Sequence, residues 1–247
     1  MKLTQKDLIR AACRAIYLWE FGDDEVGKAD RVSDAKLMNH FGLAWIKYKN
    51  GNRQIAYTSV QLRDLILNCQ VRKSQLNNPK NSQISAYLML STAVSNNAQN
   101  TYYSVLDRSK KAYSTQILLR TRCEYGMQFT KELARKLNAS SAGLRGGVQR
   151  AYASRVLFFA LPEIHVYNYS EPLVKRLKAN FGLMGDTVDE VFELMDKLYL
   201  QHEKELKNLP RPTFPSNLKA SIKQGDWWER RVLDLAVLQN WKCICKE

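Results

Sequence analysis

Residues 140–161 read SSAGLRGGVQRAYASRVLFFAL, and this stretch determines the fold that we expect. A glycine-rich segment precedes an apolar run of helical length, and glycine's backbone freedom suits such a segment to a tight turn. Pro162 follows the run and predicts its end, because proline cannot continue a helix. The stretch therefore predicts a tight turn that leads into an apolar helix.

The surroundings of this turn are strongly basic. No acidic residue lies between Glu132 and Glu163. The basic residues of the same interval are Arg135, Lys136, Arg145, Arg150 and Arg155. Backbone N–H groups at a helix N-terminus, with arginines beside them, can hold a phosphate group. The interval therefore predicts contact with a nucleic-acid backbone, and a plain loop with solvated arginines is the alternative.

Helical periodicity continues along the rest of the chain. Thr4 and Asp7 form a pattern close to a capping box at the start of the first helix, and Gly22 marks its end. Further helices are expected at about 33–45, 59–66, 82–95, 101–112, 115–137, 151–161, 172–181, 186–206 and 216–241, with Gly225 as a point of interruption in the last. The helix at 186–206 is amphipathic, and its expected inward face consists of Val188, Val191, Phe192, Met195, Leu198 and Tyr199. No strand-type alternation persists, so we predict an all-α protein. Residues 1–247 are expected to form a single domain, with 1–78 and 79–247 as its possible lobes.

The formal net charge of +14 indicates an anionic partner. A membrane-spanning helix needs about 18 or more apolar residues, and no uncharged run of that length is present. DNA is therefore the expected partner, and no membrane partner is expected.

The five cysteines are scattered and odd in number, which disfavours disulfides and favours a cytoplasmic location. Cys243 and Cys245 lack companions at metal-site spacing, so no metal and no cofactor are expected. We also expect a monomer.

Residues 153–170, ASRVLFFALPEIHVYNYS, resemble the core of the helix-hairpin-helix DNA glycosylases. They are most similar to bacterial proteins with the 8-oxoguanine DNA glycosylase fold. The helix LVKRLKANFGL at 173–183 and the segment WWERRVLD at 227–234 are similar to parts of the same family. The resemblance implies a two-lobed helical fold with a helix-hairpin-helix element. It also implies excision of a base that is flipped out of the DNA stack.

The sequence departs from the family at the catalytic position, where the resemblance places Asn168 instead of an aspartate. An asparagine can orient water but cannot carry negative charge. A carboxylate from elsewhere is then needed, and Asp23 is our candidate. Other acids considered for this role are Glu20, Asp24, Glu124 and Glu163, and a solvated surface position is the alternative for each. No lysine lies between Lys136 and Lys175, so we expect a monofunctional enzyme without a lysine Schiff base.

The resemblance also implies a surface for the DNA backbone and a pocket for the base. The residues expected at the DNA backbone are Arg145, Gly146, Gly147, Gln149, Arg150, Ser154 and Arg155. The residues expected at the base pocket are Tyr167, Tyr169 and Trp19. The two tyrosines flank Asn168 in an extended turn, and we expect them at the mouth of a cleft. His165 is interpreted as a helix-capping or solvent-facing residue, with a catalytic role as the alternative.

Three interpretations of function follow. The first is a monofunctional DNA glycosylase that removes a damaged or modified base and leaves an abasic site. Its role is DNA repair or, by analogy alone, defence against phages with modified DNA. The second is a non-catalytic DNA-binding protein on a glycosylase scaffold, and the third is an unrelated helical interaction module. Release of a base from modified DNA distinguishes the first from the other two.

Overall fold

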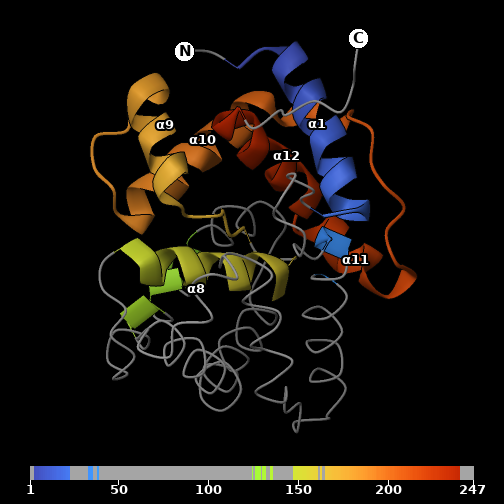
Figure 1. Ribbon diagram of the computed structural model, residues 1–247, viewed down its shortest axis with the longest axis horizontal. Helices are drawn as coiled ribbons and strands as arrows, with labels where there is room; N and C mark the ends of the chain where they lie inside the picture. Colours follow the sequence, from blue (N-terminus) through green and yellow to red (C-terminus); the bar gives the residue numbers. More distant parts are fainter. Residues whose placement is uncertain are drawn as a thin grey trace, which may run out of the picture.

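The computed structural model describes residues 3–22, 33–35, 38, 124, 126–128, 130–131, 134–135, 147–160, 162 and 165–239. The helices with described bounds are α1 (Gln5–Glu20), α8 (Gly147–Ala160), α9 (Glu171–Phe181), α10 (Val188–Lys207), α11 (Ser216–Gln224) and α12 (Trp227–Leu238). These ranges contain no strand, so the prediction of an all-α protein is confirmed for them (Figure 1).

The ends of α1 and α9 follow from local sequence. At α1, Thr4 Oγ1 accepts a hydrogen bond from the Asp7 N–H at 3.2 Å, and the Asp7 carboxylate accepts from the Thr4 N–H at 2.9 Å. α9 has Ser170 as its N-cap and Pro172 in its first turn, where a missing N–H is harmless. Gly182 ends α9 with a left-handed φ of +75°, which glycine adopts without strain. The predicted capping box and the predicted start at Pro172 are confirmed.

α12 is the centre of the described fold. α1, α9, α10 and α11 all pack against it, and Figure 1 shows it between α10 and α1. All residues from 227 to 237 are buried, as expected of a helix enclosed by neighbours on every side. The Trp227 indole N–H donates a hydrogen bond to the Phe158 carbonyl at 2.8 Å, which joins α12 to α8. α12 is therefore the core of this part of the protein.

Two further predictions about helices are confirmed, and others fall outside the described residues. The expected inward face of α10 is buried, and it consists of Val188, Val191, Phe192, Met195, Leu198 and Tyr199. A turn at Gly225 and Asp226 separates α11 from α12, as predicted. The helices expected between 41 and 123 and the lobe boundary at 78 and 79 lie outside the described residues. None of the described helices is long and apolar enough to cross a lipid bilayer.

Candidate functional site

The extended segment 165–170 lies between α8 and α9 and carries Asn168 between two tyrosines. Ser154 of α8 holds the backbone of this segment, because Ser154 Oγ accepts a hydrogen bond from the Tyr169 N–H at 2.8 Å. Ser154 is fully buried. Ser154, which was one of the residues predicted to contact DNA, therefore supports the backbone of the segment that carries the candidate site.

Arg150 of α8 holds the other side of the segment. Its guanidinium donates to the Asp186 carbonyl at 2.9 Å and to the Tyr169 hydroxyl at 3.3 Å. The Tyr169 hydroxyl itself donates to the same Asp186 carbonyl at 2.6 Å. The guanidinium also lies 5.8 Å from the centroid of the Tyr169 ring. Arg150 is half-exposed, so it joins α8 to the loop before α10 and still faces solvent in part.

Tyr167 and Tyr169 were expected at the mouth of a cleft, but both residues are buried. Their exposed fractions are 0% and 4%. Tyr167 donates its hydroxyl hydrogen to Asp196 at 3.1 Å, and its ring meets the edge of Phe192 at a centroid distance of 5.7 Å. A tyrosine can be buried when its hydroxyl finds a partner, and both hydroxyls do so here.

Trp19 is also a core residue. Its exposed fraction is 4%, and its ring packs edge-on against Phe214 and Trp227 at centroid distances of 5.2 and 5.7 Å. The aromatic cluster joins α1 to α12 and to the connector that precedes α11. All three side chains predicted for the base pocket are thus packed in the interior.

Asn168 belongs to a buried polar network. Its Nδ2 donates a hydrogen bond to Asp234 Oδ2 of α12 at 2.9 Å. Arg231, one turn earlier on α12, donates to the same Asp234 oxygen at 3.3 Å and to Asp34 Oδ2 at 2.7 Å. All four residues are buried, with at most 4% of each residue's surface exposed. The network therefore places a buried carboxylate directly against Asn168.

Three polar atoms of Asn168, Asp234 and the nearby Arg155 have no hydrogen bond to any residue that the structure describes. They are Asn168 Oδ1, Asp234 Oδ1 and Arg155 Nε, and all three are buried. The Arg155 guanidinium lies over the ring of Phe159, 5.8 Å from its centroid.

The electrostatic setting of Asp234 follows from its burial and its neighbours. Burial raises the pKa of the Asp234 carboxyl, because it disfavours the charged form. The positive charge of Arg231, the hydrogen bond from Asn168 and the positive charge of Arg155 act in the opposite direction without cancelling the effect of burial. A carboxylate with a raised pKa is a stronger base than an exposed aspartate.

His165 is buried, with 1% of its surface exposed, so its interpretation as a solvent-facing residue is wrong. Its Nδ1 lies 3.7 Å from Asp196 and its Nε2 lies 3.8 Å from Asp226, and Tyr199 packs against the ring at 5.8 Å. Burial lowers the pKa of His165, which the two aspartates raise only in part. The imidazole therefore tends to the neutral form inside the protein.

The remaining predicted site residues divide into two groups. Asp23, Arg145 and Gly146 lie outside the described residues. Gly147 is the first residue of α8, and Gln149 lies in its first turn. Their predicted roles at the DNA backbone, and that of Asp23 in catalysis, stay predictions.

The sequence interpretation missed the acidic and basic partners of Asn168. Arg231 and Asp234 stand three positions apart, which places them on one face of a helix. Their apolar surroundings at Trp228, Val232 and Leu235 were a detectable sign of a buried ion pair. Asp34 was not detectable in this way, because it is separated from Arg231 by 197 positions.

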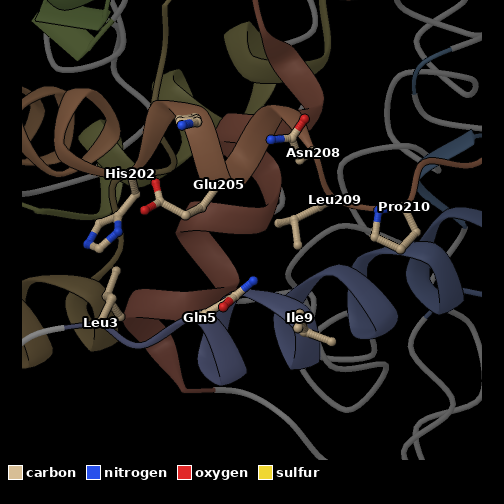
Figure 2. Close-up of a pocket in the computed structure, with 9 residues that line it drawn as sticks. Leu3, Gln5, Ile9, His202, Glu205, Asn208, Leu209 and Pro210 are labelled. Atoms are coloured by element: carbon tan, nitrogen blue, oxygen red, sulfur yellow. The ribbon is translucent and has the colours of Figure 1, made fainter.

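A groove elsewhere on the protein involves none of these residues. It lies between the start of α1 and the end of α10, as Figure 2 shows, and has a volume of about 720 Å³. Its lining consists of Leu3, Gln5, Ile9, His202, Lys204, Glu205, Asn208, Leu209 and Pro210. The residues that the structure describes contain no cluster of three or more acidic, cysteine or histidine side chains suited to a metal ion.

Comparison with known proteins finds no matching family model, no matching curated protein and no matching solved structure.

Proposed function

We propose that the protein is a monofunctional DNA glycosylase that removes a damaged or modified base and leaves an abasic site. The observation that carries the proposal is the 2.9 Å hydrogen bond between Asn168 and the buried Asp234. Asn168 stands where the resemblance places a catalytic aspartate, and Asp234 supplies the missing carboxylate at the same place. A carboxylate there can stabilise the positive charge that develops on the sugar as the base leaves.

The charge of the chain supports DNA as the partner. A net charge of +14 gives an electrostatic attraction to phosphates that does not depend on base sequence. Arg150 contributes a half-exposed guanidinium near the start of α8, close in sequence to the glycine-rich turn. A glycosylase needs such a backbone contact, because it must hold the duplex while the target base is flipped out.

A second candidate function is binding of DNA without chemistry. The low exposure of Asn168 and Asp234, at 4% and 2%, favours it, because buried polar networks also serve to fix a fold. The two candidates make opposite predictions about base release. A DNA-binding scaffold protects duplex DNA without creating abasic sites.

The decisive experiment is a base-release assay. Duplexes carrying oxidised, deaminated, alkylated or otherwise modified bases are incubated with the protein and treated with alkali, and the strands are separated on a gel. We expect cleavage at one class of base only after alkali, and no adduct that borohydride can trap. Asn168→Ala should abolish release, whereas the exposed Asn208→Ala provides a matched control. Tight binding without release from any duplex contradicts the proposal and supports the second candidate.

A further inference from the structure

His165 is a buried histidine whose two ring nitrogens face carboxylates on opposite sides. Nδ1 lies 3.7 Å from Asp196 Oδ1 of α10, and Nε2 lies 3.8 Å from Asp226 Oδ2 in the turn between α11 and α12. Both distances exceed that of a hydrogen bond, and neither nitrogen has a hydrogen-bond partner among the residues that the structure describes. Buried polar groups are almost always hydrogen-bonded, so two unpaired nitrogens on one ring mark an unusual arrangement.

The protonation state of the ring decides how many of these bonds can form. A neutral imidazole has one N–H and one bare nitrogen, and the bare nitrogen is itself an acceptor that cannot bond a carboxylate. An imidazolium has an N–H on each side and can donate to Asp196 and Asp226 together. The gap to close is about 0.8–0.9 Å on each side, because such a hydrogen bond is about 2.9 Å long.

The carboxylates have more freedom to close these gaps than the ring has. The His165 side chain is 2% exposed, and the Tyr199 ring packs edge-on against it at a centroid distance of 5.8 Å. The main-chain carbonyl of His165 lies so close to Gly126 that a Cβ added there would overlap it. By contrast, the side chains of Asp196 and Asp226 are 25% and 17% exposed, and the Asp226 side chain makes no capping bond to the start of α12.

We propose that His165, Asp196 and Asp226 form a proton-operated clasp, in which the imidazolium bonds both carboxylates at acid pH and joins α10 to the turn before α12. The clasp reaches the candidate site through Asp196, because the same Oδ1 atom accepts the Tyr167 hydroxyl hydrogen at 3.1 Å. Tyr167 precedes Asn168, so closure moves the acceptor that holds the segment next to this residue. The proton comes from solvent and returns to it when the pH rises. The clasp does not depend on the glycosylase function proposed above.

Three elements bring charged or titratable groups to His165. α10 contributes Asp196 and Tyr199, the turn contributes Asp226, and α12 contributes the cation Arg230. Burial raises the pKa of Tyr199, so this phenol stays neutral. Burial lowers the pKa of His165, the two aspartates raise it in part, and Arg230 lowers it further. The clasp therefore closes below the pH at which an exposed histidine takes up its proton.

The test is an NMR titration of the protein between pH 4 and 7.5, which follows the ring nitrogens of His165 and the backbone amides of Tyr167 and Asn168. Both amides should shift with the midpoint of the His165 ring. The shift should be absent in His165→Gln and present in His202→Gln, which removes a histidine on the groove between α1 and α10. Amides at 167 and 168 that do not follow the His165 ring overturn the proposal.

A second variant covers the case in which His165→Gln does not fold. Asp226→Asn should lower the His165 midpoint by about one pH unit, because the imidazolium loses an opposite charge. Asp189→Asn is the matched control, since Asp189 is an aspartate of α10 that pairs with Lys131, and it should leave the midpoint unchanged. An equal midpoint in the parent and Asp226→Asn overturns the clasp. Unfolding of the parent before His165 takes up its proton overturns it as well, because the closed form then never exists.

Discussion

Arg230 of α12 donates a hydrogen bond to the main-chain carbonyl of Val166, and this bond ties the central helix to the segment that carries Asn168. The same guanidinium donates to the Pro162 carbonyl at 3.0 Å and to the Gly225 carbonyl at 2.9 Å. It is fully buried, and burial lowers the Arg230 pKa to about 10, so the group is still a cation at neutral pH. One side chain thus satisfies three backbone carbonyls.

Arg230→Met should lower the free energy of unfolding by about 3 kcal/mol or more, because three buried carbonyls lose their donor. Urea denaturation of the parent and the variant measures this difference. Arg176→Met, on the exposed face of α9, is the control and should change stability by less than about 0.5 kcal/mol. Equal losses in the two variants contradict a special role for Arg230.

Gly126→Ala should destabilise the protein by about 2 kcal/mol or more, because an added Cβ overlaps the carbonyl oxygen of His165 and lies 2.9 Å from its carbonyl carbon. Gly185→Ala is the comparison, since the three atoms nearest to its added Cβ all belong to the flexible carboxylate of Glu190, and a loss of about 1 kcal/mol or less is expected. Thermal unfolding of both variants checks the ranking. A reversed ranking means that the segment around Gly126 can move away from His165.

The helices were predictable from sequence where the residues that determine them lie within the helix itself or within one turn of its end. Thr4 with Asp7, and Pro172 after Ser170, act through hydrogen bonds and dihedral preferences within one turn, so the sequence alone predicted these ends correctly. The inward face of α10 was predictable because its apolar positions repeat with the period of a helix. Such features need no knowledge of the partner element.

The site was predictable only in part, because its partners come from distant segments. Asn168 was identified by resemblance, but its partner Asp234 is 66 positions away, and no local pattern connects the two. The tyrosines on either side of Asn168 were expected at the mouth of a cleft. They are buried because Asp196 and the Asp186 carbonyl accept their hydroxyl hydrogens, and those acceptors come from elsewhere in the chain.

The stability of the protein should fall as the pH drops below about 6.5, in part because of His165. Burial lowers the His165 pKa from its ordinary value of 6.5, so the unfolded chain binds the proton first. The contribution of His165 to the free energy of unfolding is fully present above pH 6.5 and is lost as the pH falls toward the folded-state pKa of His165. The slope from one group is at most about 1.4 kcal/mol per pH unit.

His165→Gln cannot take up this proton, so its unfolding free energy should depend less on pH between about 5 and 6.5 than that of the parent. Urea denaturation at several pH values gives both curves, and their difference removes the contribution of every other acid and base. His202→Gln, on the groove between α1 and α10, serves as the control and should keep the parental slope. Parallel curves for the parent and His165→Gln would refute the prediction.

Arg150→Ala should weaken binding to duplex DNA of any sequence. If Arg150 neutralises one phosphate, the slope of log K against log salt should become shallower by about 0.9. The variant also loses bonds to the Asp186 carbonyl and the Tyr169 hydroxyl, so a stability loss of about 1 kcal/mol is expected and is checked by thermal unfolding. Lys204→Ala, which removes the same charge from the end of α10, should leave the slope unchanged. An unchanged slope in Arg150→Ala excludes this contact.

Asn168→Asp should make the folded protein less stable as the pH rises above about 4. The substitution places a second carboxyl group against Asp234, whose oxygen lies 2.9 Å from the atom that is replaced. Two buried carboxylates at this distance cannot both ionise, so the pair retains a proton in the folded state. The unfolded chain releases the protons of both carboxyl groups near pH 4. Above that pH the folded state therefore binds more protons than the unfolded state, and the stability falls with rising pH until the folded pair also ionises.

Arg231 cannot remove this effect, because its guanidinium is already shared between Asp234 and Asp34. The exchange of Asn168→Asp with Asp234→Asn is the matched control, since it keeps the charge of the parent and should show the parental dependence on pH. Urea denaturation between pH 4 and 8 measures all three proteins. A pH dependence in Asn168→Asp equal to that of the parent means that the two side chains separate when both carry charge.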